Sequence, residues 1–358
     1  MRKRILGRTG IEVSELGFGG LFASRLGPGF DVSRETVFRA VELGINFFDT
    51  APAYADSEAV LGRIIREVGG PLIVSTKLGG RPQPFDPRNQ RALVRSAEES
   101  LKALGRDVID VMFIHEPDRP LQIDWWSDPE QVEGPVLDAL DELKRRGLIR
   151  FTGLAGTTVT EMAHLIRAGD FDVVLTAFNH SPLFREADRE VLPAARAKQM
   201  GVVLGSVLHQ GAFGRRYDEV VRRKPLWLSA ARREQLLAFY TFLDELGMPI
   251  VELCLRFALS GDTASTVLIG PKTVRQVKES VAAVSKGPLP ADVLRRLDEL
   301  AAMVPFRPFE EPMILPLDRP TAYTGPGMAN LAAGVKVGSL HAEGSANEAE
   351  EPIVPVLR

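Results

Sequence analysis

The sequence contains few of the residues on which several classes of protein depend. Its 358 residues include one cysteine, Cys254, so no intramolecular disulfide is possible and a reducing compartment is favoured. No stretch approaches the roughly 20 consecutive apolar residues of a membrane-spanning helix. The basic N-terminus lacks the apolar region of a signal peptide. We therefore expect a cytoplasmic protein that does not enter a membrane.

The sequence also lacks an excess of charge of one sign. Its 44 basic and 47 acidic residues leave a net charge of −3, which gives no reason to expect a nucleic acid as partner. We find no cluster of metal ligands, no Ser/His/Asp order, and no Gly-x-Gly-x-x-Gly after an early strand. What is present is the composition of an ordinary globular protein, 45% hydrophobic and 25% charged.

Short apolar runs alternate with longer amphipathic ones along most of the chain. The short runs predict eight strands, at Ser14–Phe18, Asn46–Asp49, Leu72–Thr76, Ile109–Ile114, Phe151–Leu154, Asp172–Thr176, Val202–Val207 and Thr266–Ile269. The amphipathic runs predict helices at Ser33–Leu43, Ser57–Val68, Asn89–Leu104, Val136–Arg146, Thr160–Arg167, Ala187–Gln199, Ala230–Leu246, Val251–Leu259 and Thr273–Val284. Eight strands, each followed by a helix, predict an α/β protein of the (β/α)₈ TIM-barrel class. A doubly wound open sheet is the alternative.

Two segments interrupt the alternation of strands and helices. Arg4–Val13 reads as a β-hairpin that closes the bottom of the barrel. Glu116–Val132 is a long loop after a predicted strand, and such loops lie on the active face of a barrel. Its two tryptophans, Trp125 and Trp126, either line a substrate pocket or cover the core.

The C-terminal part of the chain differs in composition from the rest. It becomes Pro-rich from Pro305 and rich in Gly, Ala, Ser and acidic residues after Tyr323. We therefore expect residues 1–320 to form the barrel and residues 321–358 to form a peripheral or poorly ordered tail.

Three consecutive predicted strands end in polar side chains. Asp49 ends the first of them, and Tyr54 follows it five residues later. Lys77 ends the next pattern and His115 the one after. Because the carboxyl ends of parallel barrel strands meet at one mouth, we expect these four side chains to converge there. The sequence therefore predicts an acid–base centre.

The four residue types suit proton transfer to or from an oxygen atom. Tyrosine has an unperturbed pKa of about 10, which is too high for efficient proton exchange near neutrality. We expect the ammonium group of Lys77 to lower the pKa of Tyr54, and Asp49 to keep Lys77 charged. His115 is expected to hold a carbonyl or hydroxyl oxygen against the phenol. Because this set supplies no electron pair, a redox cofactor is its natural complement.

The same residues belong to a longer series of motifs that resembles the aldo-keto reductase family over about residues 3–305. The matching pieces are Gly7–Gly10, Leu16–Gly20, Gly44–Tyr54, Glu58–Gly62, Ser75–Lys77 and Ile114–His115. The resemblance implies a (β/α)₈ barrel that uses NAD or NADP, with a catalytic tetrad at Asp49, Tyr54, Lys77 and His115. It also implies that Tyr54 is the general acid in reduction and the base in oxidation, and that His115 orients the substrate.

The cofactor motifs resemble the family less evenly. Gly153–Gly156 replaces the usual Gly-x-Ser-Asn and is closer to the branch of galactose and D-threo-aldose 1-dehydrogenases. Backbone groups or Asn179 would then hold the nicotinamide carboxamide. Ser206–Gly211 resembles the loop over the pyrophosphate, and Ile269–Glu279 resembles the adenosine-binding turn, where Lys272 matches a base for a 2′-phosphate. The cofactor-binding residues implied are Gly20, Asn179, Ser206, Leu208, Gly211, Gly270, Lys272, Thr273, Gln276 and Glu279, with NAD and NADP both open.

The residues and the resemblance together predict an NAD(P)-dependent oxidoreductase that interconverts a carbonyl and an alcohol. Its small-molecule substrate would be a sugar, as for an aldose 1-dehydrogenase, or another small aldehyde or ketone. The alternative is a regulatory or sensor subunit that binds nucleotide on the same barrel with little turnover, because some members of this fold are channel-associated subunits. The complete tetrad favours the enzyme.

Overall fold

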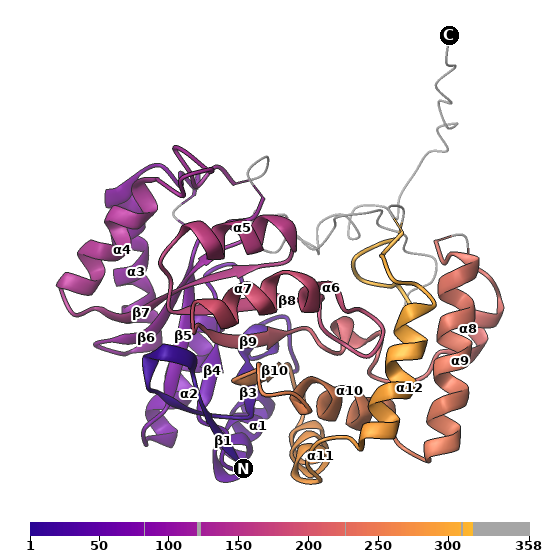
Figure 1. Cartoon of the computed structure of the whole chain (residues 1–358). Helices are drawn as coiled ribbons and strands as arrows, with labels where there is room; N and C mark the ends of the chain where they lie inside the picture. Colours follow the sequence, from indigo (N-terminus) through magenta and orange to yellow (C-terminus); the bar gives the residue numbers. More distant parts are fainter. Residues whose placement is uncertain (82, 120–122, 226, 309–310, 318–358) are drawn as a thin grey trace, which may run out of the picture.

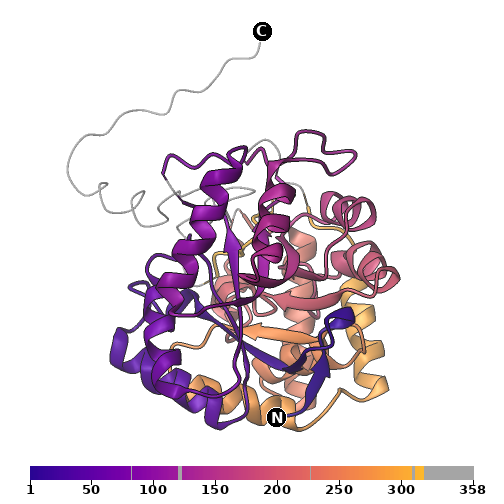
Figure 2. The ribbon, with the colours of Figure 1, turned by 90° about the vertical axis from the view of Figure 1, so that its left-hand side faces the viewer.

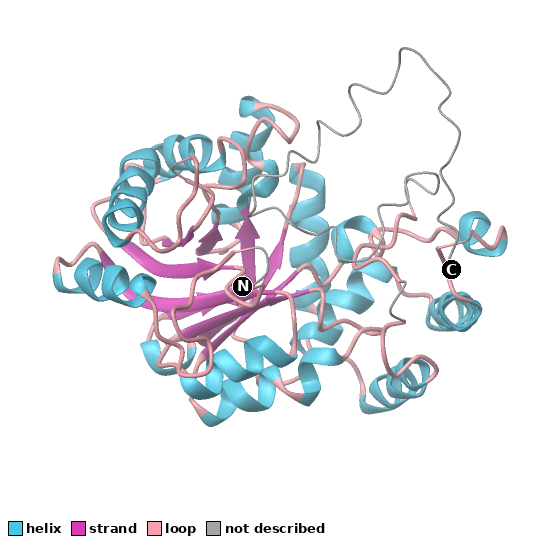
Figure 3. Cartoon of the chain, turned by 90° about the horizontal axis from the view of Figure 1, so that it is seen from above, coloured by secondary structure: helices cyan, strands magenta, loops and turns pink. Residues whose placement is uncertain are grey.

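Eight parallel strands close into a barrel. They are β3 (Leu16–Gly19), β4 (Phe47–Asp49), β5 (Ile73–Leu78), β6 (Ile109–His115), β7 (Ile149–Gly156), β8 (Val173–Ala177), β9 (Gly201–Gly205) and β10 (Thr266–Ile269), and β10 pairs with both β3 and β9. The computed structural model describes residues 1–81, 83–119, 123–225, 227–308 and 311–317. Figure 3 shows the strands surrounded by helices. The predicted (β/α)₈ barrel is confirmed, and the open sheet is excluded because the strands close on themselves.

Helices follow the strands along the chain and lie outside the barrel (Figure 3). They are α1 (Phe30–Glu42), α2 (Ser57–Val68), α3 (Gln90–Leu104), α4 (Pro135–Arg145), α5 (Thr160–Ala168), α6 (Glu186–Arg189), α7 (Val191–Ala197), α8 (Asp218–Arg222), α9 (Ala230–Leu246), α10 (Ile250–Leu259), α11 (Val274–Ser285) and α12 (Ala291–Ala302). Helices α8, α9 and α12 lie together on one side (Figure 1), over a second hydrophobic cluster that includes Phe239, Leu253 and Leu297. The single cysteine, Cys254, is buried in this cluster as a free thiol.

The structure corrects two details of the predicted helices. The helix predicted at Ser33–Leu43 begins one turn earlier, at Phe30, whose ring packs on the core. The predicted helix Ala187–Gln199 is two helices, α6 and α7, with the break after Arg189. Pro193 explains the break, because a proline clashes with the carbonyl four residues earlier in a continuous helix. In addition, α8 and α12 lie where the sequence patterns predicted no element.

The N-terminal hairpin closes one end of the barrel, as predicted. Strands β1 (Lys3–Ile5) and β2 (Glu12–Ser14) pair antiparallel and form the indigo segment of Figure 2. Between them, Leu6 and Ile11 pack with Phe113 and other side chains of the barrel interior. At Gly7, φ is +51° and an added Cβ would lie 2.1 Å from the backbone nitrogen of Gly201. Only glycine lets the hairpin approach β9 this closely.

The chain after α12 folds back on the second hydrophobic cluster. Leu315 and Leu317 are buried in it. Nε of Arg232, on α9, donates to Oε2 of Glu311 at 2.8 Å, and both side chains are buried. The predicted tail, residues 321–358, lies outside the described residues. Among the described residues, no helix has the length and apolar character needed to cross a membrane.

Candidate active site

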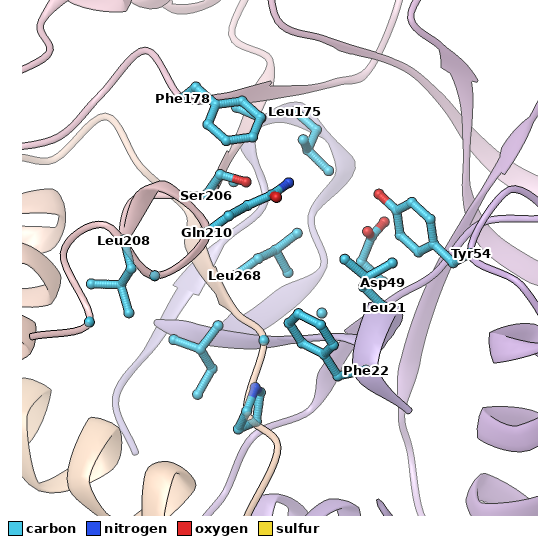
Figure 4. Close-up of a pocket in the computed structure, with 18 of the residues that line it drawn as sticks. Leu21, Phe22, Asp49, Tyr54, Leu175, Phe178, Ser206, Leu208, Gln210 and Leu268 are labelled. Atoms are coloured by element: carbon cyan, nitrogen blue, oxygen red, sulfur yellow. The ribbon is translucent and has the colours of Figure 1, made fainter. Parts of the chain in front are cut away.

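A cavity of about 520 Å³ opens where the barrel strands end. Its lining includes all four residues of the predicted acid–base centre. In Figure 4, Asp49 and Tyr54 lie on one side of the cavity, and Ser206, Leu208 and Gln210 lie on the other. The volume falls within the range of roughly 300–1,000 Å³ that is usual for small-molecule sites.

Strand register explains why residues far apart in the sequence meet here. Asp49 on β4 pairs with Ser75 on β5, and Lys77 on β5 pairs with Phe113 on β6. Paired residues of a parallel ladder share one face, and so do residues two apart on one strand. Three side chains therefore face the barrel interior at the end where the strands finish: Asp49, Lys77 and His115. This is the position predicted from the strand ends.

Lys77 and Asp49 form a buried ion pair. Nζ of Lys77 lies 2.7 Å from Oδ2 of Asp49, and their side chains are only 1% and 3% exposed. The other carboxylate oxygen accepts a 2.7 Å hydrogen bond from Oγ of Ser75, and Nζ of Lys77 also donates to the carbonyl of Thr50 at 2.7 Å. Burial lowers the pKa of Lys77, but Asp49 and the nearby phenol of Tyr54 outweigh burial, so the pKa is raised and the ammonium group stays charged.

Tyr54 lies beside this pair. Nζ of Lys77 is 4.8 Å from the centre of its ring, and the His115 ring meets it edge-on at 5.9 Å between centres. Burial raises the pKa of Tyr54; the charge of Lys77 opposes this increase, while Asp49 and Glu116 add to it. The predicted effect of Lys77, a lowering of this pKa, is present, but the net pKa is raised because desolvation of a phenolate outweighs the attraction of one ammonium group. The phenol is therefore protonated near neutral pH.

His115 is a neutral imidazole. Burial, together with the charges of Lys77 and Arg119, holds the pKa of His115 well below its ordinary value. Its Nδ1 is buried and has no hydrogen-bond partner among the described residues. A neutral imidazole carries one N–H, so it can donate a single hydrogen bond to an oxygen in the cavity.

Most of the residues implied for a cofactor line the same cavity. They are Ser206, Leu208, Gly211, Gly270, Lys272, Gln276 and Glu279. Gly20, Asn179 and Thr273 do not line it. Nδ2 of Asn179 donates instead to the carbonyl of Thr157 at 2.7 Å, and the Thr273 side chain caps α11 by accepting from the backbone N–H of Gln276. Asn179 and Thr273 therefore stabilise the backbone around the cavity and do not form part of its wall.

The predicted active-face loop, Glu116–Val132, and the loop after β3 contribute unequally to the cavity. Trp125 and Trp126 cover the core, because both are buried and donate their indole N–H groups to the carbonyls of His115 and Pro117. The loop after β3 contributes Leu21 and Phe22, which line the cavity (Figure 4).

Glu116 is a cavity residue that the sequence reasoning did not single out. It follows β6 directly, its side chain is 5% exposed, and it lines the cavity. Its Oε2 is buried without a hydrogen-bond partner in the part of the chain that the structure describes. Burial raises the pKa of Glu116 to about 7, with Arg119 lowering it and Asp118 adding to the increase. The signal that could have found it is a second ionisable residue immediately after the strand that ends in His115.

The substitution Glu116→Gln is expected to stabilise the protein increasingly as the pH rises from about 5 to 8. The folded pKa lies above the usual 4.5, so the folded state binds the proton more tightly, and ionisation costs stability between these two values. Above pH 7, ionisation of Glu116 lowers the free energy of unfolding by about 3 kcal/mol. A glutamine at this position is neutral and does not cause this loss. Thermal unfolding of parent and variant at several pH values measures the difference.

The matched control for this measurement is Glu130→Gln, at an exposed position of the same loop. We expect this control to follow the parent at every pH. A difference between Glu116→Gln and the parent that stays constant across this range would contradict the raised pKa.

Comparisons with known proteins show which family the chain is similar to. A model of the aldo/keto reductase family matches residues 15–302. The chain is 32% identical to L-galactose dehydrogenase of Arabidopsis thaliana over 298 residues, which cover 79% of this chain and 88% of that protein. It is 24% identical to D-threo-aldose 1-dehydrogenase of a Pseudomonas species over 335 residues, which cover 83% and 96%.

A solved structure is also similar. It is the holo form of an aldo-keto reductase from Bacillus halodurans, with a TM-score of 0.67 and 26% identity over 84% of this chain and 96% of that one. The family match spans most of the barrel, including the strands that carry Asp49, Lys77 and His115. The chain therefore belongs to the aldo/keto reductase family of oxidoreductases.

Proposed function

We propose that this protein is an NAD(P)-dependent oxidoreductase that interconverts a carbonyl and an alcohol, on a sugar or another small aldehyde or ketone. The observation that carries the proposal is the buried Lys77–Asp49 pair beside Tyr54 and His115, at the mouth of the barrel. Such a set moves a proton at an oxygen atom, and a family of oxidoreductases uses a barrel of this kind.

In the direction of reduction, Tyr54 donates its proton to the carbonyl oxygen of the substrate. The raised pKa suits this role, because the phenol arrives protonated. As the proton leaves, the ammonium group of Lys77 stabilises the phenolate, and Asp49 keeps that ammonium group charged and in place. His115 donates its single N–H to the same substrate oxygen and positions it. In oxidation, Tyr54 accepts the proton of the alcohol.

The side of the cavity next to α11 has features that would suit a nicotinamide nucleotide. Lys272 and Arg275 line it near the start of α11, where phosphate groups are favoured by basic side chains and a helix N-terminus. The loop after β9 turns tightly along the cavity, with left-handed backbone at Ser206 and Gln210. A nicotinamide group bound here would supply or take up the hydride that the protein's own side chains cannot provide.

A sugar or a related hydroxylated aldehyde is supported by the relatives. Two of them are named for galactose and threo-aldose substrates. Ala155 pairs with His115 across β7 and β6, and its small side chain leaves room beside the imidazole.

Titration with NADH, NADPH, NAD and NADP, followed by a panel of aldoses and simple aldehydes, tests the proposal. We expect saturable quenching of protein fluorescence by at least one nucleotide and turnover of at least one carbonyl compound. Tight binding without turnover on the whole panel would favour a regulatory or sensor subunit. Absence of any nucleotide binding would rule out both functions.

The substitution Lys272→Ala is expected to weaken NADP(H) binding about 10-fold or more, if this residue contacts a 2′-phosphate, because charge-assisted hydrogen bonds to phosphate are strong. NAD(H), which lacks that phosphate, should bind as in the parent. Fluorescence titration measures both affinities. Lys278→Ala is the control, since Lys278 is exposed on the same helix and does not line the cavity. Equal weakening of both nucleotides in Lys272→Ala would contradict the assignment.

A further inference from the structure

We infer that Glu116 is a specificity-determining residue whose carboxylate accepts a hydrogen bond from a substrate hydroxyl group next to the reacting carbonyl. The inference rests on the proposed function and narrows its substrate class to hydroxylated aldehydes, with sugars among them. Three features of Glu116 support the inference: its position, the unmet hydrogen-bonding capacity of its carboxylate, and its effect on Tyr54.

The position of Glu116 is determined by the backbone. Its N–H donates to the carbonyl of Ala155 at 2.7 Å, which continues the pairing of β6 with β7 one residue beyond His115. Its φ is +52°, a left-handed conformation that residues other than glycine adopt rarely and that is often found at functional sites. The hydrogen bond therefore holds Glu116 at the cavity in a backbone conformation that the residue would not favour by itself.

The carboxylate of Glu116 has an oxygen atom that accepts no hydrogen bond within the described residues. Oε1 lies 3.8 Å from the guanidinium group of Arg119, beyond hydrogen-bond distance, and Oε2 has no hydrogen-bond partner among the described residues. Arg119 donates to Oγ1 of Thr157 at 2.5 Å, which ties the guanidinium group to the loop after β7. A carboxylate held out of water with an unused acceptor is costly unless a ligand supplies a donor.

The neighbouring carboxylate shows what a structural role looks like in the same loop. Oδ2 of Asp118 accepts hydrogen bonds from the N–H groups of Thr157 and Thr158 and from the hydroxyl group of Thr158, at 2.6 to 2.8 Å. The other oxygen of Asp118, Oδ1, is also buried without a partner among the described residues, but Asp118 does not line the cavity, whereas Glu116 does. The two acidic residues therefore have different roles: Asp118 holds the loop, and Glu116 faces the site.

Glu116 also acts on Tyr54. Its charge contributes to the raised pKa of the phenol, so the carboxylate lies within electrostatic range of the group that would protonate the substrate. Glu116 follows His115 directly and lines the same cavity, so we place the carbon next to the reacting carbonyl where its hydroxyl group can donate to Glu116. A simple aldehyde has hydrogen atoms at that carbon and would leave the carboxylate without a donor.

The test compares two aldehydes of the same chain length, glyceraldehyde and propanal, which differ only in hydroxyl groups. We expect Glu116→Gln to lower the ratio of kcat/KM for glyceraldehyde over propanal about 10- to 100-fold, chiefly through the KM for glyceraldehyde. Glu116→Asp, which keeps the charge on a shorter side chain, should give an intermediate ratio. Glu130→Gln is the control and should retain the parent ratio, because Glu130 is exposed and does not line the cavity.

An unchanged ratio in Glu116→Gln would overturn the inference. So would a loss of affinity for the nicotinamide nucleotide, measured by fluorescence titration without substrate, that equals the loss on glyceraldehyde. Glu116 would then accept from the cofactor's carboxamide rather than from the substrate. Failure of the proposed function gives a different result from failure of the Glu116 role, because the parent protein would then turn over neither aldehyde. In that case the inference about Glu116 is also wrong.

Discussion

Replacing Tyr54 with phenylalanine is expected to lower turnover by roughly 10²–10⁴-fold, the usual contribution of a positioned general acid or base. The ring remains, so its edge contact with the His115 ring and its position over Lys77 are kept. Only the oxygen that carries the proton is removed. Steady-state kinetics on the best aldehyde of the panel measures the loss, and fluorescence titration should show a nucleotide affinity close to that of the parent.

The control for this substitution is Tyr240→Phe. Tyr240 is buried in the second hydrophobic cluster, and its hydroxyl group accepts from the backbone N–H of Tyr217 at 3.3 Å. We expect this variant to lose a little stability and to keep its turnover. Turnover by Tyr54→Phe at the parent rate would show that another group protonates the substrate.

Lys77→Met is expected to reduce both the activity and the free energy of unfolding. Removing one member of a buried ion pair leaves the other charge uncompensated, which typically costs about 3–5 kcal/mol. Here the remaining charge is Asp49, whose side chain is 3% exposed and retains only the hydrogen bond from Ser75. Denaturant unfolding measures the loss of stability, and kinetics measures the loss of turnover.

The double substitution Asp49→Asn with Lys77→Met separates the two effects. It removes the uncompensated charge, so we expect much of the stability to return while turnover stays low. Arg223→Met breaks the exposed pair with Glu219 and should change the unfolding free energy by less than about 1 kcal/mol. A double variant as unstable as Lys77→Met would show that packing, rather than charge, explains the loss.

The positions of Asp49, Lys77 and His115 were predictable from the sequence because each stands at the end of an apolar run. In a parallel barrel, all strands end at the same mouth. A local pattern that marks a strand end therefore also locates the residue in three dimensions, even when the residues are far apart along the chain. The observed strands end at Asp49 and His115 as expected, and β5 continues one residue past Lys77. Register then gives these three residues a common face.

Other parts of the site could not be predicted this way, because they depend on which side chains surround a group. The direction of the Tyr54 pKa is one example: Lys77 was visible in the sequence, but the burial that outweighs its charge was not. The two tryptophans are another example, since only the fold shows that their indole N–H groups donate to backbone carbonyl groups. Asn179 lies outside the cavity for the same kind of reason.

The sequence by itself determined the barrel, the terminal hairpin and the strand-end positions of Asp49, Lys77 and His115. These follow from periodicity and strand ends, which are local properties of the chain. Only the tertiary structure decided how those residues are charged, which cofactor positions reach the cavity, and that Glu116 has an unused acceptor there. Burial, desolvation and hydrogen-bond satisfaction arise from contacts between distant segments, so no local pattern contains them.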